Sequence, residues 1–307
     1  MVRSGSLGLT RGVPLTVSAP QVAVLREVAD VVGAWQRDDG DLQLHPGDIG
    51  WYARLGPEAT ARGLRVWRQA ERVVAVGLLD GGDLLRAAVD PEHRNDADLA
   101  RRMADDVDDP ARGVLPAGSA VVEARGAPLL LHALTARGWV DDDPWTPLRR
   151  SLAEPVPPSD LAVEVVTASS VDAWVEVHLS AFHGGSVTDG DRALVRARWA
   201  ALVGGPFAQD VTGVLGRDGD GVAVAAAAVW TAGPGRPGLL EPMGVHDGHR
   251  GHGHGRSVCL AAAAVLRAAG ASSVLVCAET ENTGAVATYE AAGFVAGEPV
   301  RDVRRDG

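Results

Sequence analysis

The second half of the chain alternates short apolar runs with stretches whose apolar residues recur at helical spacing. The apolar, partly β-branched runs predict strands at residues 161–166, 210–216, 222–230, 238–245 and 272–278. The helical spacing predicts helices at residues 171–182, 192–202, 256–269 and 283–292. Helices come first, a hairpin follows, and a strand–helix–strand–helix series closes the chain, which indicates an α/β fold with a mixed, partly antiparallel sheet.

The first half repeats the end of this pattern in a weaker form. Two apolar runs, residues 73–79 and 84–89, predict a hairpin. A helix, a short strand and a second helix are expected at residues 98–106, 120–123 and 128–137. The second helix ends at a Gly-Trp pair, as the last helix of the second half ends at Gly-Phe. We interpret this similarity as an internal duplication of a domain-sized unit.

A proline-rich stretch separates the two halves. Residues 153–160 contain three prolines and show no periodicity, which is typical of a linker. We therefore expect two domains, residues 1–154 and residues 155–307, each of a common domain size.

Composition and charge narrow the classes of function. The 307 residues include 40 acidic and 29 basic side chains, which gives a net charge of −11, and every basic residue is Arg. An acidic protein lacks the cationic excess that nucleic acids and membrane surfaces attract, so we expect neither as a partner. No apolar run approaches the roughly 18 residues of a membrane helix, and no signal peptide is evident, so we expect a cytoplasmic protein. Cys259 and Cys277 lie in apolar runs and are expected to be buried hydrophobic residues rather than nucleophiles.

The most informative segment is the glycine- and histidine-rich loop that follows the strand at residues 238–245. Glycines allow the backbone to approach a ligand, and the N–H groups of the first helical turn then point at it. Arg250 and Arg256 add charge for phosphate oxygens. The loop therefore predicts an anion-binding cradle for a phosphorylated ligand. It matches neither a dinucleotide-binding fingerprint nor a P-loop, since the third glycine position holds Arg256 and the chain has no Lys.

The cradle has the form Arg-x-x-Gly-x-Gly, with Arg250, Gly253 and Gly255, and it directly precedes a helix. This arrangement resembles the acetyl-CoA pyrophosphate loop of the GNAT acyltransferase superfamily. Downstream, Asn282, a helix carrying Tyr289 and the Gly-Phe pair resemble the closing motif of the same superfamily. The resemblance implies two tandem GNAT-like domains, each a mostly antiparallel sheet flanked by helices, and a cytoplasmic N-acetyltransferase that uses acetyl-CoA. The acetyl-CoA contacts that it implies are Met243, Gly244, Val245, Arg250, Gly251, His252, Gly253, His254, Gly255, Arg256, Asn282 and Tyr289.

The resemblance also implies a mechanism, in which an amine attacks acetyl-CoA directly within a ternary complex. Glu241, on the strand before the loop, is the first candidate for the general base and is otherwise a structural carboxylate. Tyr289 either donates a proton to the departing thiolate or is only a core aromatic residue. The backbone of residues 243–245 would polarise the thioester carbonyl. Asn282 is a helix N-cap, a ligand contact or both.

Four histidines lie in or beside the loop, namely His246, His249, His252 and His254. Their spacing matches no closed zinc site, so we expect them to face solvent or the phosphates and expect no metal.

The acceptor is expected to be a small-molecule or peptide amine. The early helices of the second half offer Glu176, His178, His183 and Asp189 as acceptor contacts, to which the sequence assigns no role. His178 shares a helical face with Trp174, which also fits a core histidine. The chain is expected to be a monomer or a homodimer.

The first half resembles the same cradle in a broken form. Counted from Arg94, the two glycine positions hold Ala97 and Leu99, and Asp96 and Asp98 place carboxylates where a pyrophosphate would lie. We interpret this half as a degenerate GNAT-like domain that is structural or shapes the acceptor site; an unrelated domain is the alternative.

The tandem arrangement is similar to that of the mycothiol synthases, which acetylate a cysteinyl amine, and this reaction is an alternative. A non-catalytic protein that binds CoA or acts as a scaffold would need the loop but neither Glu241 nor Tyr289. A module that binds a nucleotide or another phosphate is a third interpretation of the loop.

Overall fold

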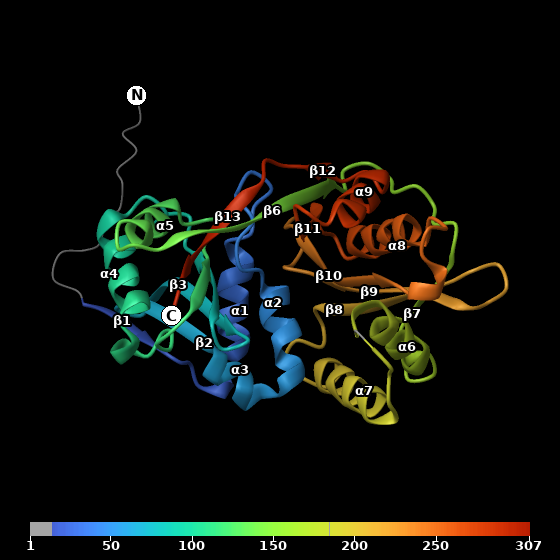
Figure 1. The fold of residues 1–307 in the computed structure, drawn as a ribbon, viewed down its shortest axis with the longest axis horizontal. Coiled ribbons are helices and arrows are strands. Elements are labelled where there is room, and N and C mark those ends of the chain that lie inside the picture. The colour runs from blue at the N-terminus through green and yellow to red at the C-terminus, as the bar shows by residue number, and fades with distance from the viewer. Residues whose placement is uncertain (1–13, 184) are drawn as a thin grey trace. The chain divides into compact units, whose positions relative to one another are not determined.

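The computed structural model describes residues 14–183 and 185–307, and the chain divides into two compact units. Of the described residues, the first unit holds residues 14–45, Pro57–Pro144 and Val300–Gly307. The second unit holds Pro46–Gly56 and Trp145–Pro299. Figure 1 shows the chain coloured from end to end, and each unit is described here by itself.

The first unit is a mixed sheet with helices packed on it. Its strands are β1 (Leu15–Ser18), β2 (Leu64–Gln69), β3 (Arg72–Asp80), β4 (Leu84–Val89), β5 (Ala120–Glu123) and β13 (Val300–Arg305). Its helices are α1 (Leu25–Ala34), α3 (Pro57–Gly63), α4 (Ala97–Asp108) and α5 (Pro128–Thr135), with short 3₁₀ turns at Val22–Val24 and Pro110–Arg112. β1, β2, β3 and β4 pair in antiparallel order, β4 pairs with β5 in parallel, and β5 pairs with β13 in antiparallel.

The second unit repeats this plan. Its strands are β7 (Ala162–Val165), β8 (Val211–Arg217), β9 (Ala223–Trp230), β10 (Gly238–Val245), β11 (Ser273–Glu279) and β12 (Val295–Ala296), with the part of β6 (Val140–Ser151) that follows Pro144. Its helices are α2 (Pro46–Tyr52), α6 (Val171–Phe182), α7 (Asp189–Val203), α8 (His254–Ala268) and α9 (Thr283–Ala291), with 3₁₀ turns at Ala53–Leu55 and Asp247–His249. β7 to β10 pair in antiparallel order, β10 pairs with β11 in parallel, and β11 pairs with β6 in antiparallel.

The two units therefore have the same order of antiparallel and parallel strand pairings. The expected mixed fold, with a mostly antiparallel sheet in each unit, is confirmed. In the second unit, α8 and α9 cover one face of the sheet and α6 and α7 cover the other (Figure 1). Trp174 of α6 is fixed to its face by a hydrogen bond from its indole Nε1 to the carbonyl oxygen of Ala227, at 3.0 Å. The site described below lies at the end of β10 between these helix layers.

The division of the chain differs from the expected boundary after residue 154. The last strand of each sheet comes from the other half of the chain, since β13 pairs with β5 and β6 pairs with β11. In addition, residues 46–56 of the first half pack in the second unit. Apolar periodicity shows where a strand lies but not which strand satisfies its backbone hydrogen bonds, and so the pattern could not reveal this exchange.

A buried ion pair accompanies the exchanged strand in the first unit. Arg125 donates two hydrogen bonds to Asp302 of β13, at 3.1 and 2.7 Å, and both side chains are almost fully buried. Burial raises the pKa of Asp302, while the Arg125 guanidinium acts in the opposite direction. The pair joins β13 to the segment that follows β5.

The core of the second unit contains the two cysteines of the chain. Cys259 of α8 is fully buried, and burial raises the pKa of its thiol to about 12. Cys277 of β11 is partly buried. The thiol of Cys259 is therefore protonated and unreactive at neutral pH.

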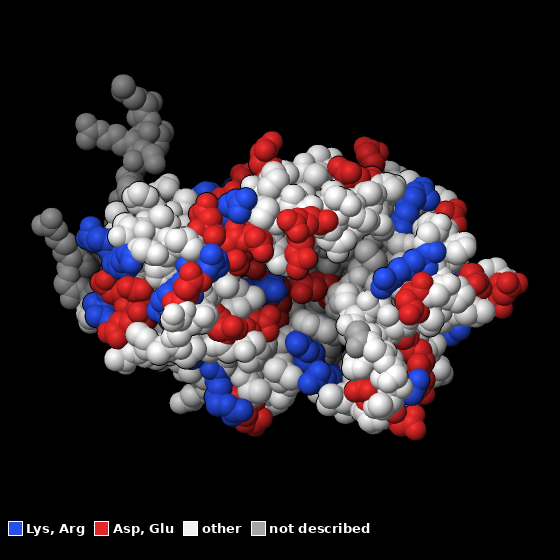
Figure 2. Space-filling view, viewed as in Figure 1, with Lys and Arg blue, Asp and Glu red and all other residues white. Residues whose placement is uncertain are grey.

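Charged side chains on the surface are largely paired. On the face shown in Figure 2, acidic and basic side chains are interspersed. On the α6–α7 pair, Arg192 bonds Glu176 and Arg196 bonds Asp172. Within the described ranges, no helix is long and apolar enough to cross a membrane.

Candidate active site

A cavity of about 710 Å³ opens in the second unit at the end of β10. Four segments form it: the end of α6, the end of β10, the loop with the start of α8, and α9. The residues that line it are Ala181, Phe182, Met243, Gly244, Val245, Arg250, Gly251, Gly253, His254, Gly255, Arg256, Asn282, Gly284, Ala285, Ala287, Thr288 and Ala291. Ten of the twelve expected acetyl-CoA contacts are among them, and His252 and Tyr289 are not.

The two parallel strands beside the cavity separate. β10 and β11 pair only through Gly238 with Val274 and Leu239 with Leu275. After a register shift that follows Leu240, β10 pairs only with β9, through Met243, Gly244 and Val245. The other edge of this backbone therefore faces the cavity, where a ligand can hydrogen-bond to it.

The loop forms a cradle at the N-terminus of α8. Gly253 caps the helix with a φ of 81°, a left-handed conformation that favours glycine. Gly255 allows α8 to meet α9 closely, because a Cβ at this position would lie 2.7 Å from Cγ2 of Thr288. The N–H groups of the first turn of α8 thus border the cavity, and the positive end of the helix dipole favours an anion there.

The end of α6 holds the start of the loop. The Ser180 hydroxyl donates a hydrogen bond to Oδ1 of Asp247 at 2.7 Å and accepts one from the Asp247 N–H at 3.0 Å. The bond from the Ser180 hydroxyl, together with one from the Gly248 N–H to the same carboxylate, lowers the pKa of Asp247. The sequence had not indicated that Ser180 and Asp247 position the loop, since they come from segments that are remote in the chain.

The two arginines of the cradle differ in their surroundings. Arg250 donates to the carbonyl oxygen of Ala181 at 3.2 Å and makes no ion pair with any residue that the structure describes. Arg256 forms an ion pair with Asp160 at 3.1 Å and also donates to the carbonyl oxygen of Ala291 at 3.2 Å. The charge of Arg256 is therefore already paired, whereas Arg250 has only an electrostatic interaction with Asp247, whose pKa it helps to lower, and remains available to a ligand.

Glu241 and Tyr289 interact electrostatically, and neither is among the residues that line the cavity. Tyr289 is 7% exposed and packs against Phe294, with 5.6 Å between the ring centroids. Burial raises the pKa of Tyr289, and nearby Glu241 adds to this effect. The Tyr289 hydroxyl is therefore protonated at neutral pH and can donate a proton but not accept one as a base. The Glu241 carbonyl oxygen accepts a hydrogen bond from the Trp230 indole at 2.8 Å.

The loop histidines lie against one another in pairs, His252 with His254 stacked and His246 with His249 edge-on. The rings of His252 and His254 are stacked with centroids 5.8 Å apart, and the centroids of His246 and His249 are 5.3 Å apart. Burial and the neighbouring His252 lower the pKa of His254, which lines the cavity. Nowhere in residues 14–183 or 185–307 do three or more His, Cys, Asp or Glu side chains gather as a possible metal site.

The expected acceptor contacts divide into two kinds. Glu176 and Asp189 both pair with Arg192, and His183 lies 3.9 Å from Asp191, so these three side chains are engaged on the α6–α7 surface. His178 instead stacks on Trp174 with 4.9 Å between the centroids. Burial lowers the pKa of His178 to about 4, so that its ring is neutral at pH 7.

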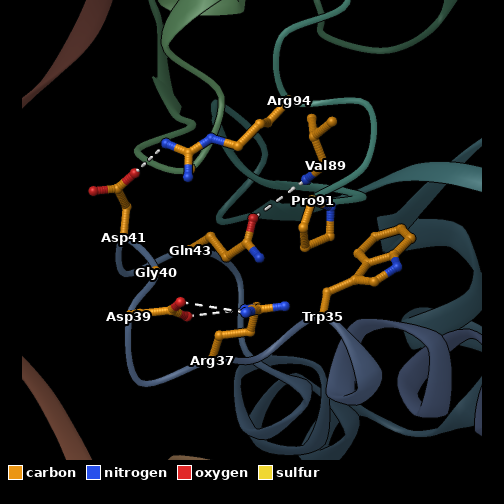
Figure 3. Close-up of a pocket in the computed structure, with 10 residues that line it drawn as sticks. Trp35, Arg37, Asp39, Gly40, Asp41, Gln43, Val89, Pro91 and Arg94 are labelled. Carbon is orange, nitrogen blue, oxygen red and sulfur yellow. Dashed lines mark hydrogen bonds and ion pairs between the residues drawn. The ribbon is translucent and has the colours of Figure 1, made fainter. Parts of the chain in front are cut away.

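In the first unit, the chain itself fills the corresponding place. The Asp96 side chain caps α4 by accepting hydrogen bonds from the N–H groups of Asp98 and Leu99. Figure 3 shows the adjoining pocket of about 280 Å³, in which Arg94 pairs with Asp41 at 2.8 Å. The Gln43 side chain accepts a hydrogen bond from the Val89 N–H at the end of β4, at 3.4 Å (Figure 3).

Sequence reasoning missed one side of the cavity. Phe182 and Ala181 come from the end of α6, and Gly284, Ala285, Ala287, Thr288 and Ala291 come from α9. The run of small residues on α9 was a possible signal, because small side chains leave room for a ligand. Phe182 gave no signal, since an aromatic residue at the end of an amphipathic helix is usually a core residue.

Comparison with known proteins identifies relatives of both the second unit and the whole chain. Residues 179–294 match the family model described as Acetyltransferase (GNAT) family. A protein of Clavibacter sepedonicus named mycothiol acetyltransferase is 29% identical over 238 residues, which cover 72% of each chain. Two solved structures share the fold over 95% of this chain. A tandem GNAT protein from the clavulanic acid biosynthesis pathway has a TM-score of 0.57, 16% identity and 98% of its own chain covered. A GCN5-related N-acetyltransferase from Sphaerobacter thermophilus has a TM-score of 0.56, 18% identity and 96% of its own chain covered.

Proposed function

We propose that the second unit, whose residues 179–294 match the model of the GNAT acetyltransferase family, transfers the acetyl group of acetyl-CoA to a primary amine. The amine attacks directly, within a ternary complex and without a covalent enzyme intermediate. The observation that carries the proposal is the continuous cavity that joins the α8 cradle to the separated end of β10.

The cavity suits an extended ligand with a phosphate-bearing end and a thioester end. The N–H groups of the α8 first turn and Arg250 receive the pyrophosphate. The backbone of Met243 to Val245 binds the pantetheine arm in the manner of an added strand. Phe182 and the small residues of α9 enclose the arm on its apolar side. Arg256 contributes less than Arg250, because Asp160 balances its charge.

The chemistry requires two proton transfers. The acceptor ammonium must lose a proton before its nitrogen can attack, and Glu241 takes that proton directly or through a water molecule. The nitrogen then bonds to the acetyl carbonyl carbon while a backbone N–H near Met243 to Val245 stabilises the oxyanion. The C–S bond breaks, and Tyr289, held protonated by burial, gives its proton to the CoA thiolate.

The first unit is proposed to be a degenerate copy that does not bind acetyl-CoA. Asp96 already caps helix α4 of this unit, and the Gln43 side chain already accepts a hydrogen bond from the Val89 N–H at the end of β4. A pyrophosphate would displace these bonds and meet the carboxylates of Asp96 and Asp98. The first unit then has a structural role. Residues 46–56, from the first half of the chain, already belong to the second unit.

A second candidate reaction is the acetylation of a cysteinyl amine. The relative from Clavibacter sepedonicus, named mycothiol acetyltransferase, supports it. Its test is to offer a cysteinyl amine beside simple primary amines and to compare kcat/KM.

Calorimetric titration of the purified chain with acetyl-CoA, beside CoA, ATP and NAD, tests the proposal. We expect one acetyl-CoA site per chain and weaker or no binding of ATP and NAD. Amine-dependent release of CoA then measures the transfer itself. Two sites per chain would contradict the degenerate first unit, and binding of acetyl-CoA without any transfer to amines would contradict the transferase and favour a CoA-binding protein.

A further inference from the structure

The strand that carries Glu241 is interrupted by a bulge. β10 pairs with β9 up to Leu240 and again from Met243 onward. The register shift between these pairs leaves Glu241 and Pro242 opposite a single residue of β9. Pro242 has no N–H to donate to a strand pairing, which favours a bulge at this position. Because a bulge bends its strand and re-aims the side chains, its geometry sets the direction of the Glu241 side chain.

The last residue of β9 holds this bulge in place. Trp230 is fully buried, and its indole Nε1–H donates a hydrogen bond to the Glu241 carbonyl oxygen at 2.8 Å. A bulge interrupts the ladder of backbone hydrogen bonds, and the indole supplies a donor at the point of interruption. The position of the Glu241 backbone therefore depends on the position of one aromatic ring.

The Trp230 ring is in turn held by α2, a helix that the first half of the chain contributes to the second unit. α2 contacts both β9 and β10. Gly50 of α2 lies directly on the ring, because a Cβ at this position would be 2.3 Å from Cζ3 and 2.7 Å from Cε3 of Trp230. Any side chain at residue 50 would have to displace the ring, and a buried ring in a close-packed interior has little room to move.

We propose that Trp230 is a positioning residue for acetyl transfer: held by Gly50, its indole fixes the bulge and thereby places the Glu241 carboxylate for proton removal from the acceptor amine. A general base acts only within hydrogen-bond reach of the proton that it takes, and a displacement of about 1 Å can cost about 10²-fold in rate. The first half of the chain thus contributes to catalysis through α2. The inference rests on the proposed acetyl transfer, because Glu241 is the candidate base of that reaction.

Trp230→Phe tests the hydrogen bond, since phenylalanine keeps an aromatic ring but has no N–H. With CoA release as the assay, we expect kcat to fall by about 10–10²-fold. KM and the calorimetric affinity for acetyl-CoA should be unchanged, because Met243 to Val245 pair with β9 beyond the bulge and the cradle lies on α8. The matched control is Trp67→Phe in the first unit. Trp67 is also fully buried and donates one indole hydrogen bond, to Asp106 at 3.0 Å, so its loss should leave kcat and KM unchanged.

A double-mutant cycle with Glu241→Gln separates positioning of the base from a general loosening of the fold. If Trp230 acts through the Glu241 carboxylate, Trp230→Phe should lower kcat in the wild-type chain but change it little in the Glu241→Gln chain. Equal factors in the two backgrounds, or an unchanged kcat in Trp230→Phe alone, would overturn the inference and leave the transferase standing.

Gly50→Ala tests the contact with α2. The added methyl group displaces the Trp230 ring, so we expect the same fall in kcat as for Trp230→Phe. The matched control is Gly190→Ala in α7, another helix of the second unit, because a Cβ there would meet only the Thr188 hydroxyl oxygen at 3.5 Å. Full kcat in Gly50→Ala would overturn the part assigned to α2.

The wild-type chain shows by itself whether the transferase stands. If it acetylates no amine, the proposed function fails, and NMR signals of the indole N–H groups then decide the positioning. The Trp230 signal is the one absent from Trp230→Phe. Slow exchange of this N–H with solvent in the wild-type and Gly190→Ala chains, with fast exchange in Gly50→Ala, would support the held bond to Glu241, and equal exchange in all three would overturn it.

Discussion

At the scale of single residues, surroundings rather than residue type decide which side chains are available to a ligand. Arg250 opens the glycine motif and Arg256 directly follows it, but Asp160 forms an ion pair only with Arg256. Similarly, Arg196 and Arg198 lie two residues apart on α7, but only Arg196 has an acidic partner among the described residues.

The two cradle arginines should therefore differ in their effect on acetyl-CoA. Arg250→Gln removes a charge that forms no ion pair with a described acid and interacts with Asp247 only electrostatically, and we expect acetyl-CoA affinity to fall by about tenfold or more. Arg256→Gln removes a charge that Asp160 already neutralises, and we expect a smaller fall. Calorimetry at two salt concentrations measures both, and equal losses in the two variants would contradict the assignment.

Glu241 is tested by a variant of the same shape. Glu241→Gln removes the base, so we expect kcat to fall by about 10²–10⁴-fold while the affinity for acetyl-CoA is retained. Raising the pH should restore part of the rate, because more of the amine is then already deprotonated. Full activity across the pH range would exclude Glu241 as the base.

At the scale of elements, the start of α8 shows what the glycines of the motif do. Gly253 adopts a left-handed conformation at the N-cap, where a Cβ would meet no atom within 4 Å. A side chain there would therefore project into the space of the ligand rather than into the protein. In the first unit, the equivalent helix begins with Asp96, whose carboxylate satisfies the N–H groups that the cradle leaves for a phosphate.

Gly253→Asp should convert the working cradle into the form seen in the first unit. We expect acetyl-CoA binding to be lost, because the carboxylate repels the pyrophosphate. Gly221→Asp is the matched control, since Gly221 has nearly the same φ, of 82°, and equally open surroundings in the β8–β9 turn. Both variants carry the same backbone strain, so calorimetry should show a loss of binding only in Gly253→Asp, and a loss in both would attribute the effect to strain.

At the scale of the whole molecule, each sheet is completed by a strand from the other half of the chain. In the first unit, β13 brings Asp302 to Arg125, and the pair is buried. A buried ion pair is weak evidence for stability, but breaking it leaves an uncompensated buried charge. The last residues of the chain therefore belong to the fold of the first unit rather than to a trailing end.

Arg125→Met should destabilise the first unit by about 3–5 kcal/mol at pH 7, measured by urea unfolding. With Arg125 absent, burial acts on Asp302 unopposed and raises its pKa further above the unfolded value. The variant should therefore be most stable at low pH and lose stability as pH rises through the folded pKa. Arg125→Met combined with Asp302→Leu should recover most of the loss, and an unchanged midpoint in Arg125→Met alone would show that the pair does not hold β13.

Much of the second unit was predictable because its signals are local. Helix α6 and strand β10 fall on the expected residues, and α8 begins two residues before the expected start because Gly253 caps it. Ten of the residues that the motifs singled out line the cavity, since they lie close together in the chain or at the start of α9, and their contact with acetyl-CoA stays a prediction. Residues 14–63 carried too weak a pattern to predict β1, α1 and α2.

The sequence by itself determined the elements, the acidic character, the anion cradle and its resemblance to the GNAT loop, because each depends on residues close together in the chain. Only the tertiary structure decided the exchange of β6 and β13, the pairing of Arg256 with Asp160 across 96 residues, and the packing of Trp174 of α6 on Trp199 of α7. The physical reason is that periodicity and spacing fix local conformation and the buried face of each element. Tertiary packing then decides which distant residues hydrogen-bond to a strand edge, pair with a charge or cover an aromatic ring.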